Sequence, residues 1–185
     1  RGGREHLLIS ENRLEHAGIP IVQVERGGKI TYHAPGQLVV YPILNLAQSG
    51  LGVADYVNAL EEVMIRTCAA WDVSAERNEV NRGIWVGKKK IGSIGIAVRR
   101  DISFHGMALN VAPDLDPFCW VEPCGLEGVS MTSMQQELDK PVAVHQVKAS
   151  IVDEFSAVFG VSLQSMHVAD LPMSCNASPM KLRPV

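Results

Sequence analysis

This 185-residue sequence has no long apolar run, few cysteines and no excess of positive charge. No stretch approaches eighteen consecutive apolar residues, so we expect no transmembrane helix. The four cysteines form no C-x-x-C pair and no dense framework, which favours a reducing compartment, the cytoplasm. The formal net charge of −3 argues against a general nucleic-acid binder, because such domains are usually strongly basic. We therefore expect a cytoplasmic protein that binds neither nucleic acid nor a membrane.

Internal repeats, low-complexity tracts and linkers are also absent, which predicts a single domain, long enough for one hydrophobic core. Apolar patterns predict helices over residues 5–17, 53–71 and 142–159, strands over 19–25, 37–44 and 103–111, and a hairpin over 83–98. Strands with helices at both ends indicate an α+β fold, a mixed sheet flanked by helices. Residues 172–185 contain few apolar side chains, and we expect them to form a loosely held tail.

The segment RGGKITYHAPGQ, residues 26–37, is rich in glycine and lies between two predicted strands. It contains neither G-x-x-x-x-G-K-[ST] nor a G-x-G-x-x-G that opens a helix, so the two standard phosphate-binding loops are excluded. Two interpretations remain. Either the glycines let the backbone approach a ligand closely, with Arg26 and His33 as polar contacts, or the segment is a tight turn that leads into a strand.

Cys124 is a candidate nucleophile because it lies at a bend, between Pro123 and Gly125. Cys68 falls on the apolar stripe of a predicted helix and Cys119 in an apolar stretch, so we interpret both as structural. The cysteine of the tail is assigned no function. The bend therefore singles out one thiol for chemistry.

A catalytic thiol needs a neighbouring group that favours its thiolate form. The candidates are His33, His105 and one of the three lysines at 88–90. Lys90 begins a predicted strand and can point inward, whereas Lys88 and Lys89 fall in the turn before it, where we expect them to be solvated. Spacing alone leaves a Cys–Lys pair and a Cys–His pair both open.

Five blocks of the sequence resemble the octanoyltransferases of lipoate biosynthesis, also called lipoyl(octanoyl) transferases. The blocks are RGGKITYHAPGQLVVYP (26–42), GIWVGKKKIGSIG (83–95), SFHGMALNV (103–111), DLDPF (114–118) and EPCG (122–125). They occur in the order of the family, and the resemblance extends to about residue 160. It implies the fold of the biotin and lipoate protein ligase catalytic domains. It also implies that residues 1–185 form a single acyltransferase domain without the family's N-terminal segment.

The resemblance implies an activity in which an octanoyl group moves from octanoyl-acyl carrier protein to a lysine of a lipoyl domain. The acceptors would be the lipoyl domains of 2-oxoacid dehydrogenase complexes and the glycine cleavage H protein. Cys124 matches the family's cysteine, which carries the acyl group as a thioester. Lys90 matches the lysine that favours the thiolate and moves protons. The resemblance implies no cofactor: neither a metal, nor ATP, nor a nucleotide.

The family's acyl-substrate contacts come from three blocks, and carrying them over one residue at a time gives the substrate-binding prediction. The residues are Arg26, Gly27, Gly28, Lys29, Ile30, Thr31, Tyr32, His33, Ser93, Ile94, Gly95, Gly106, Met107 and Ala108. The protein partners of the family tend to be acidic, so we expect the basic runs at 88–90 and 99–100 to form a docking patch.

The sequence departs from the family at two positions of these blocks. It has Ala34 where glycine is usual and Gly92 where alanine is common, and a positive φ at Ala34 would strain the loop. Three other functions are alternatives. They are an ATP-dependent lipoate or biotin protein ligase of the same fold, a non-catalytic module that binds lipoyl domains or acyl carriers, and a Cys–His hydrolase.

Overall fold

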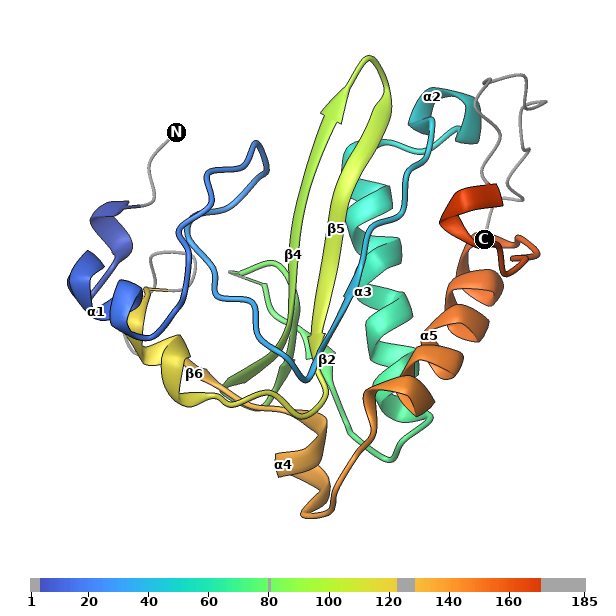
Figure 1. Cartoon of the computed structure of the whole chain (residues 1–185). Helices are drawn as coiled ribbons and strands as arrows, with labels where there is room; N and C mark the ends of the chain where they lie inside the picture. The colour runs from blue at the N-terminus through green and yellow to red at the C-terminus, as the bar shows by residue number, and fades with distance from the viewer. Residues whose placement is uncertain (1–3, 80, 123–128, 171–185) are drawn as a thin grey trace.

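One mixed β-sheet organises the protein in a computed structural model, which describes residues 4–79, 81–122 and 129–170. Within these ranges the sheet has six strands, in the order β1-β5-β4-β3-β2, and β6 pairs with β4 (Figure 1). The strands are β1 (Gln37–Val40), β2 (Glu76–Arg77), β3 (Ile84–Val86), β4 (Lys89–Arg99), β5 (Ile102–Asn110) and β6 (Ser130–Met131). All neighbours run antiparallel except β4 and β6, which are parallel. The predicted mixed sheet is confirmed.

The long hairpin of β4 and β5 is closed by a two-residue turn. Arg99 pairs with Ile102, and the residues between them, Arg100 and Asp101, have φ values of 50° and 63°. Two successive positive φ angles define the turn type whose twist matches that of the flanking strands. The turn fixes the register of the whole hairpin and sets Gly95 of β4 opposite Gly106 of β5.

Helices α3 (Val53–Ala69) and α5 (Val144–Phe159) cover one face of the sheet (Figure 1). Their apolar stripes close the core against the strands, as predicted. The fully or nearly fully buried residues include Leu60, Met64 and Cys68 of α3, Val147 and Ile151 of α5, and Ile84, Ile91 and Leu109 of the sheet. Burying a large aliphatic side chain contributes roughly 1.5–3 kcal/mol, so this layer anchors the sheet from one side.

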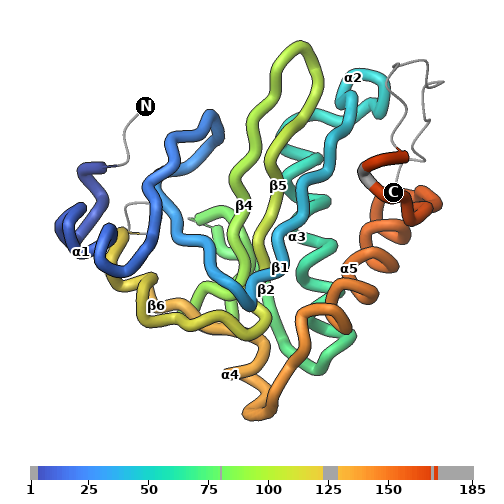
Figure 2. Tube along the Cα trace, viewed as in Figure 1, coloured from blue at the N-terminus to red at the C-terminus, as the bar shows by residue number. Residues whose placement is uncertain are grey.

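Residues 19–33 form an extended segment on the other side of β4 and β5 from α3 and α5, to the left of β4 in Figure 2. The remaining helices are short. They are η1 (Arg4–His6), α1 (Glu11–His16), α2 (Leu46–Ser49), η2 (Asp116–Trp120), α4 (Met134–Leu138) and η4 (Val168–Asp170). Within the described ranges, none of the helices combines the length and apolar character needed to cross a membrane.

Two predicted elements near the N-terminus are wrong. Residues 19–25 form no strand, and most of their side chains are exposed, because the segment joins the sheet only beyond them, where the Gly27 amide donates to the Ile96 carbonyl over 2.7 Å. Of the helix predicted over 5–17, the α-helical part is α1 alone. Leu7 forms a β-bridge with Val121 instead, and Ser10 is the N-cap of α1, where its side chain accepts a hydrogen bond from the Arg13 amide. Local apolar patterns do not encode either contact.

The end of one predicted strand differs from the structure, and the predicted tail lies outside the described residues. The strand predicted over 37–44 ends at Val40, because Pro42 has no amide hydrogen to extend the ladder. The predicted tail, 172–185, lies outside the described residues.

Candidate functional site

A cavity of about 450 Å³ lies between residues 19–33 and the strands β4 and β5. Most of the predicted substrate-binding residues line it, although they come from three separate blocks of the sequence. They are Arg26, Gly28, Lys29, Ile30, Thr31, Tyr32 and His33 of the loop, Ser93, Ile94 and Gly95 of β4, and Gly106, Met107 and Ala108 of β5. The structure therefore brings the three blocks to one place.

Gly27 does not line the cavity but holds the loop against β4. Its amide donates to the Ile96 carbonyl, and a Cβ atom at position 27 would lie 3.3 Å from that same oxygen. The Arg26 guanidinium donates to the Gly27 carbonyl over 2.9 Å, and its aliphatic stem crosses Gly95, where a Cβ atom would lie 2.8 Å from Cδ. Glycine at 27 and 95 thus allows the loop to approach the strand closely.

The loop leaves the cavity through a tight turn at Pro35 and Gly36. The Gln37 amide donates to the Ala34 carbonyl over 3.2 Å, and Gly36 has φ = 92°. Proline followed by a glycine of positive φ is the pattern of a type II turn, and a residue before proline favours extended backbone. Ala34 is not among the residues of positive φ, so alanine there causes no strain. The positive φ that the loop needs lies at Gly36.

His33 is fixed by neighbours in the same turn. Its Nδ1 atom lies 2.9 Å from Oε1 of Gln37, whose amide nitrogen donates to Oδ1 of Asn110 at the end of β5 over 2.7 Å. The imidazole is therefore oriented by the sheet. His105, the other candidate histidine, also lines the cavity and packs edge-to-face against Tyr41, with 5.8 Å between the ring centroids.

Apolar side chains supply much of the remaining wall. Tyr32 packs edge-to-face on Phe118 of η2 at 5.3 Å between centroids, and both residues line the cavity together with Met131 of β6. A cavity with apolar walls and a few polar groups suits a ligand that combines an apolar chain with a polar reacting group.

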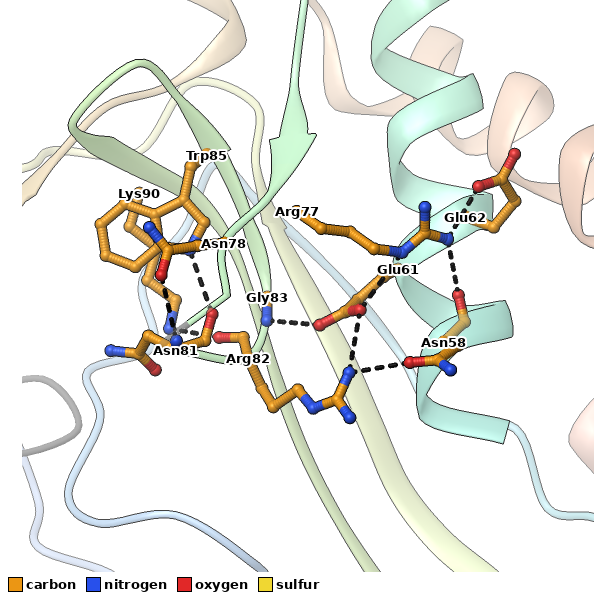
Figure 3. Close-up of polar contacts among 10 residues, drawn as sticks. All are labelled: Asn58, Glu61, Glu62, Arg77, Asn78, Asn81, Arg82, Gly83, Trp85 and Lys90. Atoms are coloured by element: carbon orange, nitrogen blue, oxygen red, sulfur yellow. Dashed lines mark hydrogen bonds and ion pairs between the residues drawn. The ribbon is translucent and has the colours of Figure 1, made fainter. Parts of the chain in front are cut away.

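Lys90 points inward from the start of β4, as predicted, and is only 1% exposed. Its Nζ atom donates to the Arg82 carbonyl over 2.7 Å and lies 5.3 Å from the centre of the Trp85 ring (Figure 3). Lys90 is not among the cavity-lining residues, but Met131, its partner in the β4–β6 pairing, is. The lysine is therefore paired in the sheet with a residue that lines the cavity.

Lys89 corrects the prediction that it is a solvated turn residue. It is the first residue of β4, and its ammonium forms an ion pair with Glu137 of α4 at 2.7 Å. Burial raises the pKa of Glu137, but hydrogen bonds from Lys89 and Thr132 outweigh it and leave that pKa below its usual value. The expected docking patch also has fewer free positive charges than predicted, because Lys90 is buried and Arg99 forms an ion pair with Glu25 at 2.6 Å.

Cys124 lies outside the described residues, and the Cys–Lys pair stays a prediction. The described chain on both sides of it borders the cavity, through Phe118 before and Met131 after. Cys68 is a core residue, as predicted, and burial raises the pKa of its thiol to about 12. Cys119 is exposed, which corrects its interpretation as a structural residue.

Sequence reasoning missed one buried charged residue near the site. Glu61 of α3 is 2% exposed, and its carboxylate accepts a hydrogen bond from the Gly83 amide over 2.9 Å. Its only sequence signal is an acidic residue inside a strongly apolar helix, directly after Leu60. As for metals, the described ranges hold no group of three or more His, Cys, Asp or Glu side chains suited to bind an ion.

Comparisons with known proteins agree on one family. The model of the lipoyl protein ligase A/B catalytic domain matches residues 1–156. The octanoyltransferase of Desulfotalea psychrophila is 49% identical over 162 residues, which span 86% of this chain and 73% of the relative. The octanoyltransferase of Syntrophobacter fumaroxidans is 50% identical over 159 residues, spanning 86% of this chain and 70% of that protein. Among solved structures, a lipoate-protein ligase A bound with ATP superposes with a TM-score of 0.72 at 16% identity, covering 91% of this chain and 70% of the ligase. At 16% identity the structural match supports a shared fold and nothing further.

Proposed function

Because this chain belongs to the lipoyl protein ligase A/B catalytic domain family, we propose that it moves an octanoyl group from acyl carrier protein to a lipoyl-domain lysine through a thioester on Cys124. The chain is an octanoyltransferase of lipoate biosynthesis, being about half identical to octanoyltransferases over most of its length. The proposal adds the donor, the acceptor and the covalent intermediate. The observation that supports it best is the cavity, because residues of three separate family blocks line it.

The proposed reaction has two steps that balance. In the first, the Cys124 thiolate attacks the carbonyl of the carrier thioester, the bond from that carbonyl to the carrier's sulfur breaks, and the carrier leaves as a thiolate that takes a proton from the Lys90 ammonium. In the second, the neutral amine of the acceptor lysine attacks the Cys124 thioester. An amide bond forms, the cysteine leaves as a thiolate, and the proton lost from nitrogen returns to Lys90, which the first step left neutral. A second thioester keeps the acyl group activated between the two partners.

The cavity wall fits both steps. Apolar residues such as Phe118, Met107 and Met131 suit the hydrocarbon chain, and the close loop–strand packing at Gly95 brings backbone groups near the cavity. Amide hydrogens in such a wall can meet the negative charge that develops on the attacked carbonyl oxygen. Acceptors in this proposal are the lipoyl domains of 2-oxoacid dehydrogenase complexes and the glycine cleavage H protein. We place the reaction in the cytoplasm on the strength of the cysteine pattern.

The test is to incubate the protein with octanoyl-acyl carrier protein without ATP and to locate the adduct by mass spectrometry of peptides. We expect an octanoyl group on Cys124 that disappears when a lipoyl domain is added. C124S removes the adduct and the transfer, whereas C119S, which changes an exposed thiol, keeps both. An absolute need for ATP would identify a ligase instead. A complete absence of adduct would leave a binding module, and normal turnover by C124S would refute the thioester.

A further inference from the structure

One peptide unit, between Arg82 and Gly83, is held by charged groups at both ends (Figure 3). Its N–H group donates to Oε1 of Glu61 over 2.9 Å, and its carbonyl accepts from Nζ of Lys90 over 2.7 Å. The two bonds run in series: carboxylate, peptide N–H, peptide carbonyl, ammonium. A carboxylate on helix α3 is thereby connected to the lysine on β4 through a single rigid, planar group.

Glu61 is well placed to hold this peptide because its own position is fixed. Its side chain is 2% exposed on a helix whose neighbouring residues form the core. Its second oxygen, Oε2, lies 3.4 Å from both the Arg77 guanidinium and the Arg82 guanidinium. A buried carboxylate is retained only when it is paired, and here two half-exposed arginines and one backbone amide pair with it.

The loop backbone also lies directly on the lysine. Gly83 has φ = 108°, and a Cβ atom there would lie 2.3 Å from the Gly92 carbonyl oxygen and 2.9 Å from Cε of Lys90. Only glycine lets the loop pass this close to β4. The contact between the Arg82 carbonyl and the ammonium is therefore built into the backbone rather than dependent on a flexible side chain.

We propose that Glu61 is a positioning residue for Lys90 in acyl transfer. It fixes the Arg82–Gly83 peptide and, through that peptide, favours the ammonium form of the lysine. The inference rests on the proposed function in one respect, namely that Lys90 acts on the thiol of Cys124. It adds a residue of α3 that lies outside the cavity.

The physical argument is that a negative charge at the N–H end of a peptide acts in the same sense as the peptide dipole. It makes the carbonyl oxygen a better acceptor for a positive charge. In the described part of the chain, the other charged groups near this unit include Glu62 of α3, Arg77 of β2, the Arg82 side chain and, beyond β6, the pair of Lys89 and Glu137. Both arginines contact Oε2 of Glu61, whereas Oε1 accepts from the peptide, so the guanidinium groups lie on the other oxygen of the carboxylate.

Glu61→Gln is the informative substitution. A glutamine oxygen can still accept from the Gly83 amide, so the variant keeps the loop in place and removes only the charge. Glu62→Gln is the matched control. It removes a carboxylate from the adjacent position, whose ion-pair partners are Arg66 and Arg77, each at 2.8 Å, rather than the peptide. Hydrogen bonds from Arg66 and Arg77 lower the pKa of Glu62, so the control also removes a full negative charge.

The readout is the rate at which iodoacetamide alkylates Cys124, followed on its peptide by mass spectrometry between pH 5 and 10, together with octanoyl transfer at pH 7. We expect E61Q to move the alkylation profile upward by about one pH unit and to lower transfer about tenfold, since one unit changes the charged fraction tenfold. E62Q stays within about twofold of the wild type on both measures. K90A moves the profile at least as far as E61Q.

These variants separate the two proposals. If K90A leaves the alkylation profile unchanged, the Cys–Lys pair of the proposed function fails, and this inference fails with it. If K90A moves the profile but folded E61Q does not, only the inference on Glu61 is overturned, and a fall in melting temperature alone then marks Glu61 as structural. Should E61Q not fold, E61D serves instead. It keeps the charge but withdraws it from Gly83, so we expect a smaller upward shift, and a profile identical to the wild type overturns the inference.

Discussion

Two glycines that face each other across β4 and β5 give a matched test of how the cavity is built. Gly95 and Gly106 are paired in the hairpin, and both line the cavity. A Cβ atom at Gly106 would lie 2.2 Å from the Val40 carbonyl oxygen and 2.7 Å from Cδ of Pro42. At Gly95 the nearest atom would be Cδ of Arg26, at 2.8 Å. The same substitution to alanine therefore meets backbone in one case and a flexible side chain in the other.

The two contacts predict different losses of stability. In Gly106→Ala the edge strand β1 has to move about 1 Å away from β5, and overpacking of this kind costs about 1–3 kcal/mol. Weakened ladder hydrogen bonds add about 1 kcal/mol, and the stiffer unfolded chain returns about 0.4–1 kcal/mol. The net loss is about 1–3.5 kcal/mol, or about 2–14 °C in melting temperature for a chain of this size. In Gly95→Ala the Arg26 side chain swings aside, and we expect a change below about 2 °C.

The assay is thermal unfolding followed by circular dichroism, combined with steady-state octanoyl transfer. We expect G106A to lose stability, whereas G95A stays stable but raises KM for the acyl donor more than it lowers kcat, because Arg26 leaves the cavity wall. Equal melting temperatures for the two variants would refute the reasoning, since it depends on the difference between a backbone and a side-chain neighbour. A G95A variant with unchanged KM would remove Arg26 from the binding wall.

Three further outcomes follow from the described contacts. Ala34→Gly should lower the melting temperature by about 1–3 °C in thermal unfolding, because the alanine has ordinary backbone and glycine only adds unfolded-state entropy; a rise would mean hidden strain. In native protein at pH 8, iodoacetamide should label exposed Cys119 but not Cys68, whose pKa burial raises to about 12, as peptide mass spectrometry would show. Because the pKa of Glu137 is lowered in the folded state, the stability that it contributes is present above its unfolded pKa and lost as pH falls through the folded value. The difference in urea unfolding free energy between wild type and E137Q should therefore shrink below about pH 4.5, and a difference independent of pH would refute the pairing with Lys89.

Local patterns predicted the parts of the fold that local forces decide. The apolar stripes of α3 and α5 and the hairpin predicted over 83–98, which corresponds to β3 and β4, each lie within one segment, and the structure has all three. Residues 19–25 have the apolar content of a strand, yet no strand beside them in the described ranges offers its backbone. A strand is defined by its neighbour, and a single sequence does not show which neighbour is available.

The residues of the cavity were predicted from the family resemblance, but the way in which the fold brings them together was not. The resemblance named its residues by block, but their convergence depends on the register that sets Gly95 opposite Gly106 and on the backbone hydrogen bond from Gly27 to Ile96. Lys89 shows why a charge run is a weak guide. Adjacent residues of a strand point to opposite faces, so one lysine of the run is buried over Trp85 and its neighbour forms an ion pair with Glu137.

Glu61 was beyond the reach of sequence reasoning for a more general reason. Its bond to Gly83 joins a side chain to backbone, and a backbone amide has no letter in the sequence that marks it as a partner. The apolar stripe of α3 predicts burial for Leu60 and Met64 but treats Glu61 as the edge of that stripe. What retains a carboxylate there is the combination of Arg77, Arg82 and a peptide whose other end accepts from Lys90. Removing the lysine and removing the carboxylate should therefore interact: with Lys90 absent, E61Q should no longer alter the alkylation profile of Cys124, and any remaining shift would mean that the carboxylate acts on the thiol by another route.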